Sequence, residues 1–325
     1  MTLARQVAPD AVPSPRAASG LLLPWIALVA VWFLWGSTYI GIRYAVKTIP
    51  PLLMSGSRYF SAGVILMVVL VLKERGWPRM TLRQTVCTAI AGAAMLLGGN
   101  GLLSLGEQHL QSGVAALLVA TVPLTMIVES AVIRRTGIAG RSIIAIILGS
   151  AGVVILIGAP GSTIDYAAAA SVFIGAFFWA TGSVFLTTAD MPRNPVLATA
   201  MEMIFGGILL IIAGTATGEI GSLHFATIST ASTLGWLWLI GPGAILGFSA
   251  YTFALNTLPT STVATYAYVN PVVAVSLGAM LGDQLLTGGL LFGGAAVIGA
   301  VVVTLSKRRV REVDAIPIEP MAEIA

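Results

Sequence analysis

The chain alternates long runs of apolar residues with short polar connections from Trp25 to Leu305. Each run holds about 20 residues, and a helix of that length crosses a hydrocarbon core roughly 30 Å thick. The runs predict ten transmembrane helices, with boundaries at 25–46, 52–72, 84–105, 112–133, 142–158, 166–187, 196–216, 233–254, 261–281 and 288–305. We therefore expect an all-α membrane protein in a lipid bilayer, because only helices and closed barrels satisfy their backbone there.

The composition agrees with this class, because 57% of the residues are hydrophobic and only 9% are charged. Soluble domains carry roughly 25% charged residues. Residues 1–24 contain Pro9, Pro13 and Pro15 and are expected to form a disordered cytoplasmic arm, and residues 306–325 are expected to form a cytoplasmic tail. The apolar run after the arm is too long for a signal-peptide core, so we expect it to be retained as the first helix.

Lysine and arginine are distributed unevenly between the two sides of the ten-helix arrangement. Of 17 such residues, 14 fall in the arm, in the even-numbered connections and in the tail, whereas the odd-numbered connections hold only Lys47. Arg43 and Arg58 lie inside predicted helices. Because cytoplasmic loops carry the excess of positive charge, we expect both termini to be cytoplasmic and the protein to be a multi-pass protein of the cytoplasmic (inner) membrane.

The second half of the chain repeats features of the first. Pro195 lies 144 residues after Pro51, and Trp179 lies 144 residues after Trp35. The repeat divides the chain into two five-helix units, 25–158 and 166–305. Because five is odd, the two units insert with opposite orientation, which is the inverted-repeat plan of secondary carriers. Chance similarity between apolar helices is the alternative explanation of the sequence match.

Together these features resemble the drug/metabolite transporter (DMT) superfamily, and within it the EamA-type members with two five-helix repeats. The resemblance covers nearly all of 25–306 and rests on WGSTYI at Trp35–Ile40, Pro51, Arg58, Pro123, Trp179 and the segment Leu255–Asp283. Such families typically place an acidic residue at the end of the fourth and ninth helices. Asp283 occupies the second of these positions, whereas the first reads Arg134-Arg135, which puts in doubt any role that needs both acids.

The resemblance implies a central cavity walled by helices one, three, four, six, eight and nine, and export of amino acids or other metabolites. In character the chain is similar to bacterial exporters of aromatic and neutral amino acids. We therefore expect a secondary transporter that works by alternating access. A membrane-embedded enzyme is one alternative, and a channel or scaffold without carrier activity is another.

Aromatic and polar side chains at helical spacing are the candidates for lining the cavity. Tyrosine and tryptophan combine an apolar body with one hydrogen-bonding group, which suits an amphipathic or aromatic solute. Ordinary helix packing is the alternative for each of them. The predicted cavity residues are Trp35, Tyr39, Asn100, Thr121, Thr125, Trp179, Tyr251, Tyr266 and Asn270.

Three charged residues inside helices are candidates for gating or coupling, because a charge at the bilayer centre costs roughly 2.5–3.5 kcal/mol on insertion scales. Arg58 and Glu202 are partners in the repeat, and their depths predict that they do not form a direct salt bridge. Each is expected to order groups at one gate, or else to be a structural charge satisfied by neighbouring helix ends. Glu129 continues the polar stripe of Thr121 and Thr125, and either acts as a protonatable site or extends to the interface.

The sequence lacks the residue patterns of several other classes of protein. The single cysteine, Cys87, and the two histidines, His109 and His224, form no metal-ligand pattern, so we expect no metal site and no cofactor. We find no nucleophile with a base at helix depth, no phosphate-binding GxxxxGK[ST] loop and no soluble basic module for nucleic acid. The expected partner is a small-molecule substrate, and the oligomeric state, monomer or homodimer, is left open.

Overall fold

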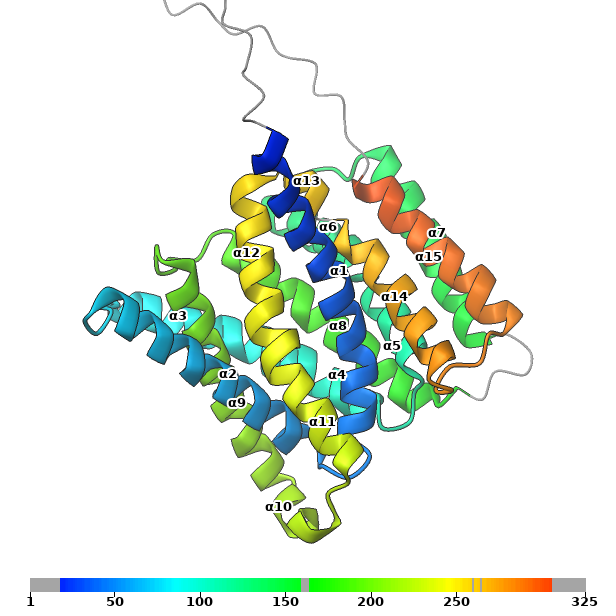
Figure 1. The fold of residues 1–325 in the computed structure, drawn as a ribbon. Coiled ribbons are helices and arrows are strands. Elements are labelled where there is room, and N and C mark those ends of the chain that lie inside the picture. The colour runs from blue at the N-terminus through cyan, green and yellow to red at the C-terminus, as the bar shows by residue number, and fades with distance from the viewer. Residues whose placement is uncertain (1–17, 159–163, 259, 264, 306–325) are drawn as a thin grey trace, which may run out of the picture.

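The computed structural model describes residues 18–158, 164–258, 260–263 and 265–305, and these form a bundle of helices (Figure 1). The first half contains α1 (Ala18–Ala45), α2 (Pro51–Glu74), α3 (Leu82–Gly92), α4 (Leu102–Gly106), α5 (Ser112–Val119), α6 (Val122–Arg134) and α7 (Gly140–Gly158). The second half contains α8 (Tyr166–Leu186), α9 (Pro195–Ala216), α10 (Glu219–Ser222), α11 (Thr230–Trp238), α12 (Gly247–Thr257), α13 (Thr260–Val263), α14 (Tyr266–Met280) and α15 (Gly288–Leu305).

Some of these helices join end to end into continuous spans. Within the described residues, eight helical segments are long and apolar enough to cross a membrane, and two shorter apolar helices, Tyr266–Met280 and Gly288–Thr304, complete the set. The predicted all-α membrane fold of ten apolar segments is therefore confirmed. The arm up to residue 17 and the tail from residue 306 lie outside the described residues.

Two helix boundaries differ from the sequence prediction. Helix α1 begins at Ala18, seven residues before the predicted start at 25, so residues 18–24 are helical and not part of an arm. Pro24 is the seventh residue of this helix, and its missing N–H leaves the carbonyl oxygen one turn earlier without its usual intrahelical donor. The ninth segment, predicted to begin at 261, begins with the single turn α13, and the longer helix α14 starts only at Tyr266.

The third span of each half contains a π-helical stretch that the sequence did not predict. In the first half, η2 (Ala93–Gly101) separates α3 from α4, and in the second half η4 (Leu239–Leu246) separates α11 from α12. The stretch η2 carries a glycine cluster, and η4 carries Pro242, which lacks a backbone donor. Such stretches are rare and are frequent at functional sites.

Helices α2 and α9, which are partners in the repeat, pack against each other through glycine (Figure 1). A Cβ atom on Gly56 would lie 3.0 Å from the carbonyl oxygen of Gly207, and one on Gly207 would lie 2.9 Å from that of Gly56. A Cβ on Gly63 would lie 2.7 Å from the carbonyl oxygen of Ala200. Because Gly63 and Gly207 are equivalent in the repeat, the two halves meet here through corresponding surfaces, in agreement with an inverted repeat.

Large apolar side chains cover the outside of the bundle. Examples with more than half of the side chain exposed are Leu72, Val132, Ile147, Phe292 and Val154. Contiguous apolar surface of this kind is unusual on a soluble monomer, and it is what a hydrocarbon environment requires. The buried hydrophobic core lies inside, around residues such as Met54, Leu117, Leu118, Val172 and Leu239.

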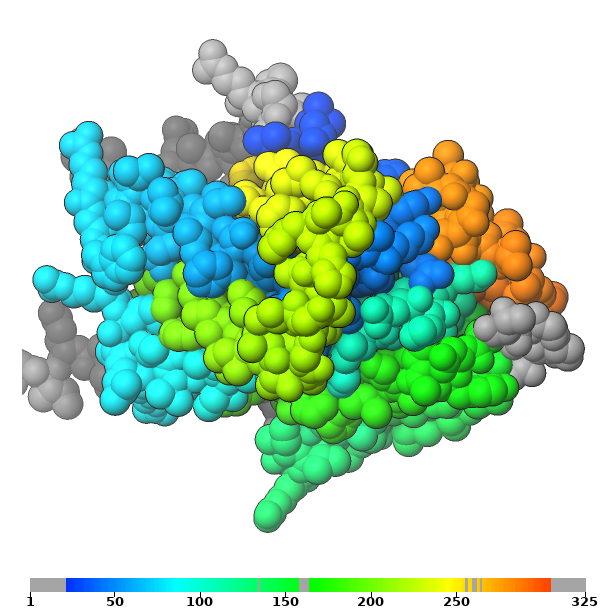
Figure 2. All heavy atoms as spheres, turned by 90° about the horizontal axis from the view of Figure 1, so that it is seen from below, coloured from blue at the N-terminus to red at the C-terminus, as the bar shows by residue number. Residues whose placement is uncertain are grey.

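The two ends of the bundle are distinguished by the chain termini. Helix α1 begins and α15 finishes at one end, which we call the termini end, and the opposite end is the far end (Figure 1). The far end contains the connections 46–50, 107–111, 217–229 and 281–287. Figure 2 looks onto the far end and shows the yellow-green segment around α10 and α11 crossing the middle of that face, between blue and teal parts of the first half.

Candidate functional site

Three of the predicted cavity residues come together from distant parts of the sequence. The ring of Trp35 on α1 lies 4.9 Å from that of Tyr251 on α12 and 5.1 Å from that of Tyr266 on α14. The rings of Tyr251 and Tyr266 lie 5.7 Å apart in an edge-to-face arrangement, which aromatic pairs favour. This aromatic cluster of Trp35, Tyr251 and Tyr266 therefore joins the first half of the chain to the second.

The backbone around the aromatic cluster is packed closely. A Cβ atom on Gly247 would lie 2.6 Å from Nε1 of Trp35, so the indole packs directly on the backbone of α12. A Cβ on Gly36 would lie 2.6 Å from Cβ of Val273, which shows that α1 and α14 are equally close. Substitutions at these two glycines would displace the cluster.

Asn270 and Trp32 hold α1 and α14 together beside the aromatic cluster. With its amide oriented to satisfy both ends, the buried Asn270 donates to the carbonyl oxygens of Trp32 and Tyr266, each at 3.2 Å. The indole Nε1 of Trp32 donates to Oγ1 of Thr265 at 3.2 Å. Asn270, predicted to line a cavity, therefore bonds backbone groups in this conformation.

Arg58 lies in a buried polar cluster between α2 and the π-helical stretch η2. Its side chain is only 3% exposed, and Nη2 donates to Oδ1 of Asn100 at 2.9 Å and to the hydroxyl of Tyr59 at 3.0 Å. Within the described residues its Nε has no hydrogen-bond partner and no carboxylate lies within salt-bridge distance. A second buried pair, Ser55 and Ser104, shares a hydrogen bond of 2.7 Å beside it.

The other two predicted gating residues lie elsewhere. Glu202 is half-buried on α9, and in the described part of the chain it makes no ion pair with Arg58. Glu129 on α6 accepts a hydrogen bond of 2.8 Å from Oγ1 of Thr181 on α8, so it joins the two halves near the termini end.

Thr121 and Thr125 do not present their hydroxyl groups as a polar stripe. Oγ1 of Thr121 donates to the carbonyl oxygen of Leu118 at 2.6 Å, and Oγ1 of Thr125 donates to that of Thr121 at 3.3 Å. The helix is interrupted at Thr121, between α5 and α6, because Pro123 cannot supply a backbone donor to the preceding turn. Both hydroxyls therefore donate to carbonyl oxygens of the preceding helical turn.

Trp179 and Tyr39 take different positions. Trp179 on α8 packs against the π-helical stretch, where a Cβ on Gly99 would lie 3.1 Å from its ring, and it makes no ring contact with the aromatic cluster. Tyr39 packs against the main hydrophobic core, and its hydroxyl lies within electrostatic range of Tyr266, Tyr59 and Glu107.

A charged network at the far end was not predicted from the sequence. Nε of Arg43, near the end of α1, pairs with Oδ1 of Asp283 at 3.1 Å, and Nη1 donates to the carbonyl oxygens of Glu107 and Gln108 at 2.8 and 2.7 Å. The second oxygen of Asp283 accepts from the backbone N–H of Ser112 at 3.0 Å. This far-end network joins α1, the connection between α4 and α5, and the end of α14.

Glu107 lies within the far-end network and was also missed. Its side chain is fully buried, and neither carboxylate oxygen has a hydrogen-bond partner among the described residues. Burial raises the pKa of the Glu107 carboxyl well above its usual range, although the positive charges of Arg58 and Arg43 oppose the shift. No sequence signal could have found it, because a glutamate in a short connection ordinarily faces water.

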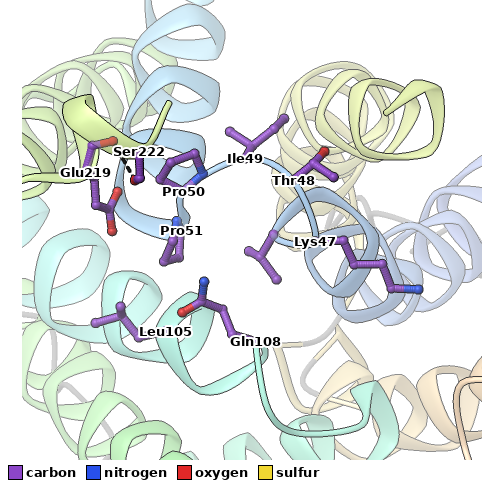
Figure 3. Close-up of a pocket in the computed structure, with 10 residues that line it drawn as sticks. Lys47, Thr48, Ile49, Pro50, Pro51, Leu105, Gln108, Glu219 and Ser222 are labelled. Carbon is purple, nitrogen blue, oxygen red and sulfur yellow. Dashed lines mark hydrogen bonds between the residues drawn. The ribbon is translucent and has the colours of Figure 1, made fainter. Parts of the chain in front are cut away.

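The far end also contains a cavity of about 350 Å³ (Figure 3). Glu219 on α10 lies in its wall and accepts hydrogen bonds from the backbone N–H groups of Leu52 and Leu53, at 3.2 and 2.9 Å, which caps the start of α2. Figure 3 shows the amide of Gln108 directed into the cavity and the side chain of Lys47 directed away. The cavity is lined by Val46, Lys47, Thr48, Ile49, Pro50, Pro51, Leu105, Gln108, Glu219 and Ser222.

Within the described ranges no group of three or more histidine, cysteine, aspartate or glutamate side chains is placed to hold a metal ion. The polar groups of the aromatic cluster, of the polar cluster around Arg58 and of the far-end network are tyrosine hydroxyls, amides, guanidinium groups and single carboxyls.

Comparison with known proteins agrees with this architecture. The model of the EamA-like transporter family matches residues 22–158 and 167–306. The "Uncharacterized inner membrane transporter YedA" of Escherichia coli is 37% identical over 88% of this chain and 92% of its own length. The "Uncharacterized transporter YvbV" of Bacillus subtilis is 23% identical over 95% and 98%, and "Protein PecM" of Dickeya dadantii 23% over 83% and 88%.

A solved crystal structure has the same fold, with a TM-score of 0.58 at 18% identity over 88% of this chain and 97% of that one. The fold and the family match define a multi-pass membrane transporter of the inner membrane, and not an enzyme. The chain belongs to the EamA-like transporter family of the DMT superfamily, with one EamA unit in each half.

Proposed function

We propose that this transporter exports neutral or aromatic amino acids, or closely related small metabolites, by alternating access. The observation that carries the proposal is the aromatic cluster of Trp35, Tyr251 and Tyr266, which is built from both halves of the chain. Rocking of one inverted half against the other would separate these rings and open a binding site between them. Aromatic faces with polar tips favour a solute that has an apolar side chain.

The distribution of basic residues along the chain disfavours a substrate that carries a phosphate. Arg43 and Arg58 are the two basic residues that the sequence prediction places inside helices, and no lysine or arginine occurs from Asn194 to Ser306. A doubly charged phosphate is normally held by several cationic groups. Sugar phosphates and nucleotide sugars are therefore disfavoured.

The test is solute counterflow in proteoliposomes, screened across amino acids together with a thermal-shift assay, because a ligand of the folded state raises its apparent stability. We expect one class of amino acid to give saturable counterflow. The Trp35→Ala variant should lose affinity for it, and Trp35→Phe, which keeps an aromatic face, should retain most of it. A flux that never saturates and shows no counterflow would favour a channel, and no flux for any solute would favour a scaffold.

We also propose that the termini end is cytoplasmic and the far end periplasmic. The distribution of lysine and arginine supports this orientation. The orientation does not depend on whether the protein is a monomer or a homodimer. Reporter tags fused to the two chain ends test it, because both tags should report a cytoplasmic location.

A further inference from the structure

The far-end network places two acidic side chains around one arginine. Asp283 is paired with Arg43 at 3.1 Å, whereas Glu107, whose main-chain oxygen binds the same guanidinium, has no partner for its carboxylate. Both acids are largely removed from water: Glu107 is fully buried and the Asp283 side chain is 7% exposed. The guanidinium of Arg43 therefore pairs with the carboxylate of Asp283, and the carboxylate of Glu107 has no hydrogen-bond partner among the described residues.

A buried carboxylate without a hydrogen-bonding partner is unstable in its charged form, and it persists in a folded protein mainly by binding a proton. The titratable and charged groups around Glu107 are Tyr39 and Arg43 on α1, Arg58 on α2 and Asp283 after α14. The arginines favour an ionised Glu107 and Asp283 opposes it, and burial outweighs them. In this closed arrangement the neutral acid is the favoured form.

We propose that Glu107 is a proton-binding site, and that the far end closes when Glu107 takes up a proton and opens when Glu107 releases it to water on the far side. This rests on the proposed function, because only a carrier that alternates has a far end that opens. The step involves a single proton passing between the carboxyl oxygen and water, and no other bond changes.

The geometry explains the coupling. When Glu107 is neutral, it does not compete for Arg43, and Arg43 pairs with Asp283 and so ties α1 to the end of α14. When Glu107 is ionised, its carboxylate attracts the guanidinium that already binds its own backbone oxygen. Arg43 then has two competing acids, the bond to Asp283 weakens, and the two helix ends can separate.

The direction with pH follows from linkage. The pKa of Glu107 is raised in the closed state, and in an open, hydrated state it returns toward its ordinary value, so closure takes up a proton between these two pKa values. Closure is therefore fully favoured below the ordinary pKa and is lost as the pH rises through the raised one. Within that window the ratio of closed to open carrier falls by about tenfold per pH unit.

The test measures the opening of the far end by cysteine labelling. Ser112 is fully buried beneath Asp283, and its hydroxyl has no hydrogen-bond partner among the described residues. A Ser112→Cys variant in a Cys87→Ser background should be modified by an impermeant maleimide only when the far end opens. Ser222, which is exposed at the same end, provides a Ser222→Cys reference, and the ratio of the two rates removes the pH dependence of the thiol reaction.

From about pH 5 to about pH 9 the normalised labelling of Ser112→Cys should rise, with a slope of up to tenfold per pH unit. Adding Glu107→Gln, which imitates the neutral acid, should leave labelling low at every pH, and Glu107→Asp should restore the dependence. Asp283→Asn should instead raise labelling at low pH, because Arg43 loses its partner. Opposite effects at neighbouring acids are not expected from a general loss of packing.

His109 is the matched control, because it is exposed and lies two residues from Glu107. His109→Gln should leave the pH dependence intact. The inference is overturned if labelling of Ser112→Cys in the Cys87→Ser background does not change with pH. It is also overturned if the pH dependence survives in Glu107→Gln or vanishes in His109→Gln. If counterflow is intact while labelling is flat, only this inference fails; if no solute shows counterflow, the proposed function fails whatever the labelling.

Discussion

The hydrogen bond between Asn100 and Arg58 gives the sharpest stability prediction. Asn100→Ala removes the acceptor that lies 2.9 Å from Nη2 of a guanidinium only 3% exposed. In the described structure Arg58 then keeps the hydroxyl of Tyr59 as its remaining side-chain acceptor, and its Nε is already without a partner. A hydrogen bond to a charged group contributes about 1.5–3 kcal/mol, so we expect a loss of that size in the free energy of unfolding.

Ser104→Ala is the control, because it removes a neutral buried hydrogen bond of 2.7 Å to Ser55 in the same cluster. A neutral bond contributes about 0.5–1.5 kcal/mol, so this variant should lose less. The double variant Arg58→Met with Asn100→Leu removes the buried charge together with its acceptor. It should be more stable than Asn100→Ala alone, because replacing both partners by apolar groups leaves no unpaired charge.

The assay is reversible unfolding in mixed micelles with increasing denaturing detergent, followed by tryptophan fluorescence and helical circular dichroism. The free energies of the four proteins are compared at a common detergent composition. If Asn100→Ala unfolds at the same point as the unmodified protein, the bond to Arg58 does not stabilise the fold. If the double variant is no more stable than Asn100→Ala, an unpaired guanidinium is not the cause of the loss.

The remaining predictions concern packing and capping. Gly207→Ala should reduce expression and thermal stability sharply, because its Cβ would lie 2.6 Å from the backbone nitrogen of Phe60. Gly299→Ala is the control and should be tolerated, because the nearest neighbour of its Cβ would be 3.6 Å away. Equal stability of the two variants would contradict the close contact at Gly207. Glu219→Ala should cost about 0.5–2 kcal/mol, because the start of α2 loses its cap, and faster hydrogen exchange at Leu53 would report it.

The architecture could be predicted from the sequence because hydropathy and helix length act locally. Apolar runs of bilayer length specify spans whatever their neighbours are, and the repeat of Pro51 at Pro195 located the two halves. The π-helical stretches were not predictable, since a glycine cluster in an apolar run is equally compatible with an α-helix. The early start of α1 at Ala18 was missed because prolines are frequent before residue 25 and because Pro24 lies inside the helix, where proline ordinarily interrupts one.

The candidate site could be predicted only in part. Trp35 and Tyr266, which were candidates because of their helical spacing, lie in ring contact in the structure, whereas helical spacing alone does not specify which helices meet. The roles of Arg43 and Glu107 depend on which loop lies beside which helix end, and residues 240 positions apart pair through tertiary contacts that no local pattern encodes. Glu107 in particular looks like an ordinary loop charge until its burial is known.

The ion pair between Arg43 and Asp283 has no mirror image in the other half. By the offset of 144 the counterpart of Arg43 is Thr187, whose hydroxyl donates to the carbonyl oxygen of Val184, and the position equivalent to Asp283 is occupied by the arginines at the end of α6. At these positions the two halves therefore form different contacts, an ion pair in one and a hydrogen bond from a hydroxyl to the backbone in the other. Salt screens exposed charges much more than partly buried ones, and the Asp283 side chain is only 7% exposed. Raising the ionic strength should therefore weaken the exposed pair of Arg83 with Asp190 far more than the pair of Arg43 with Asp283.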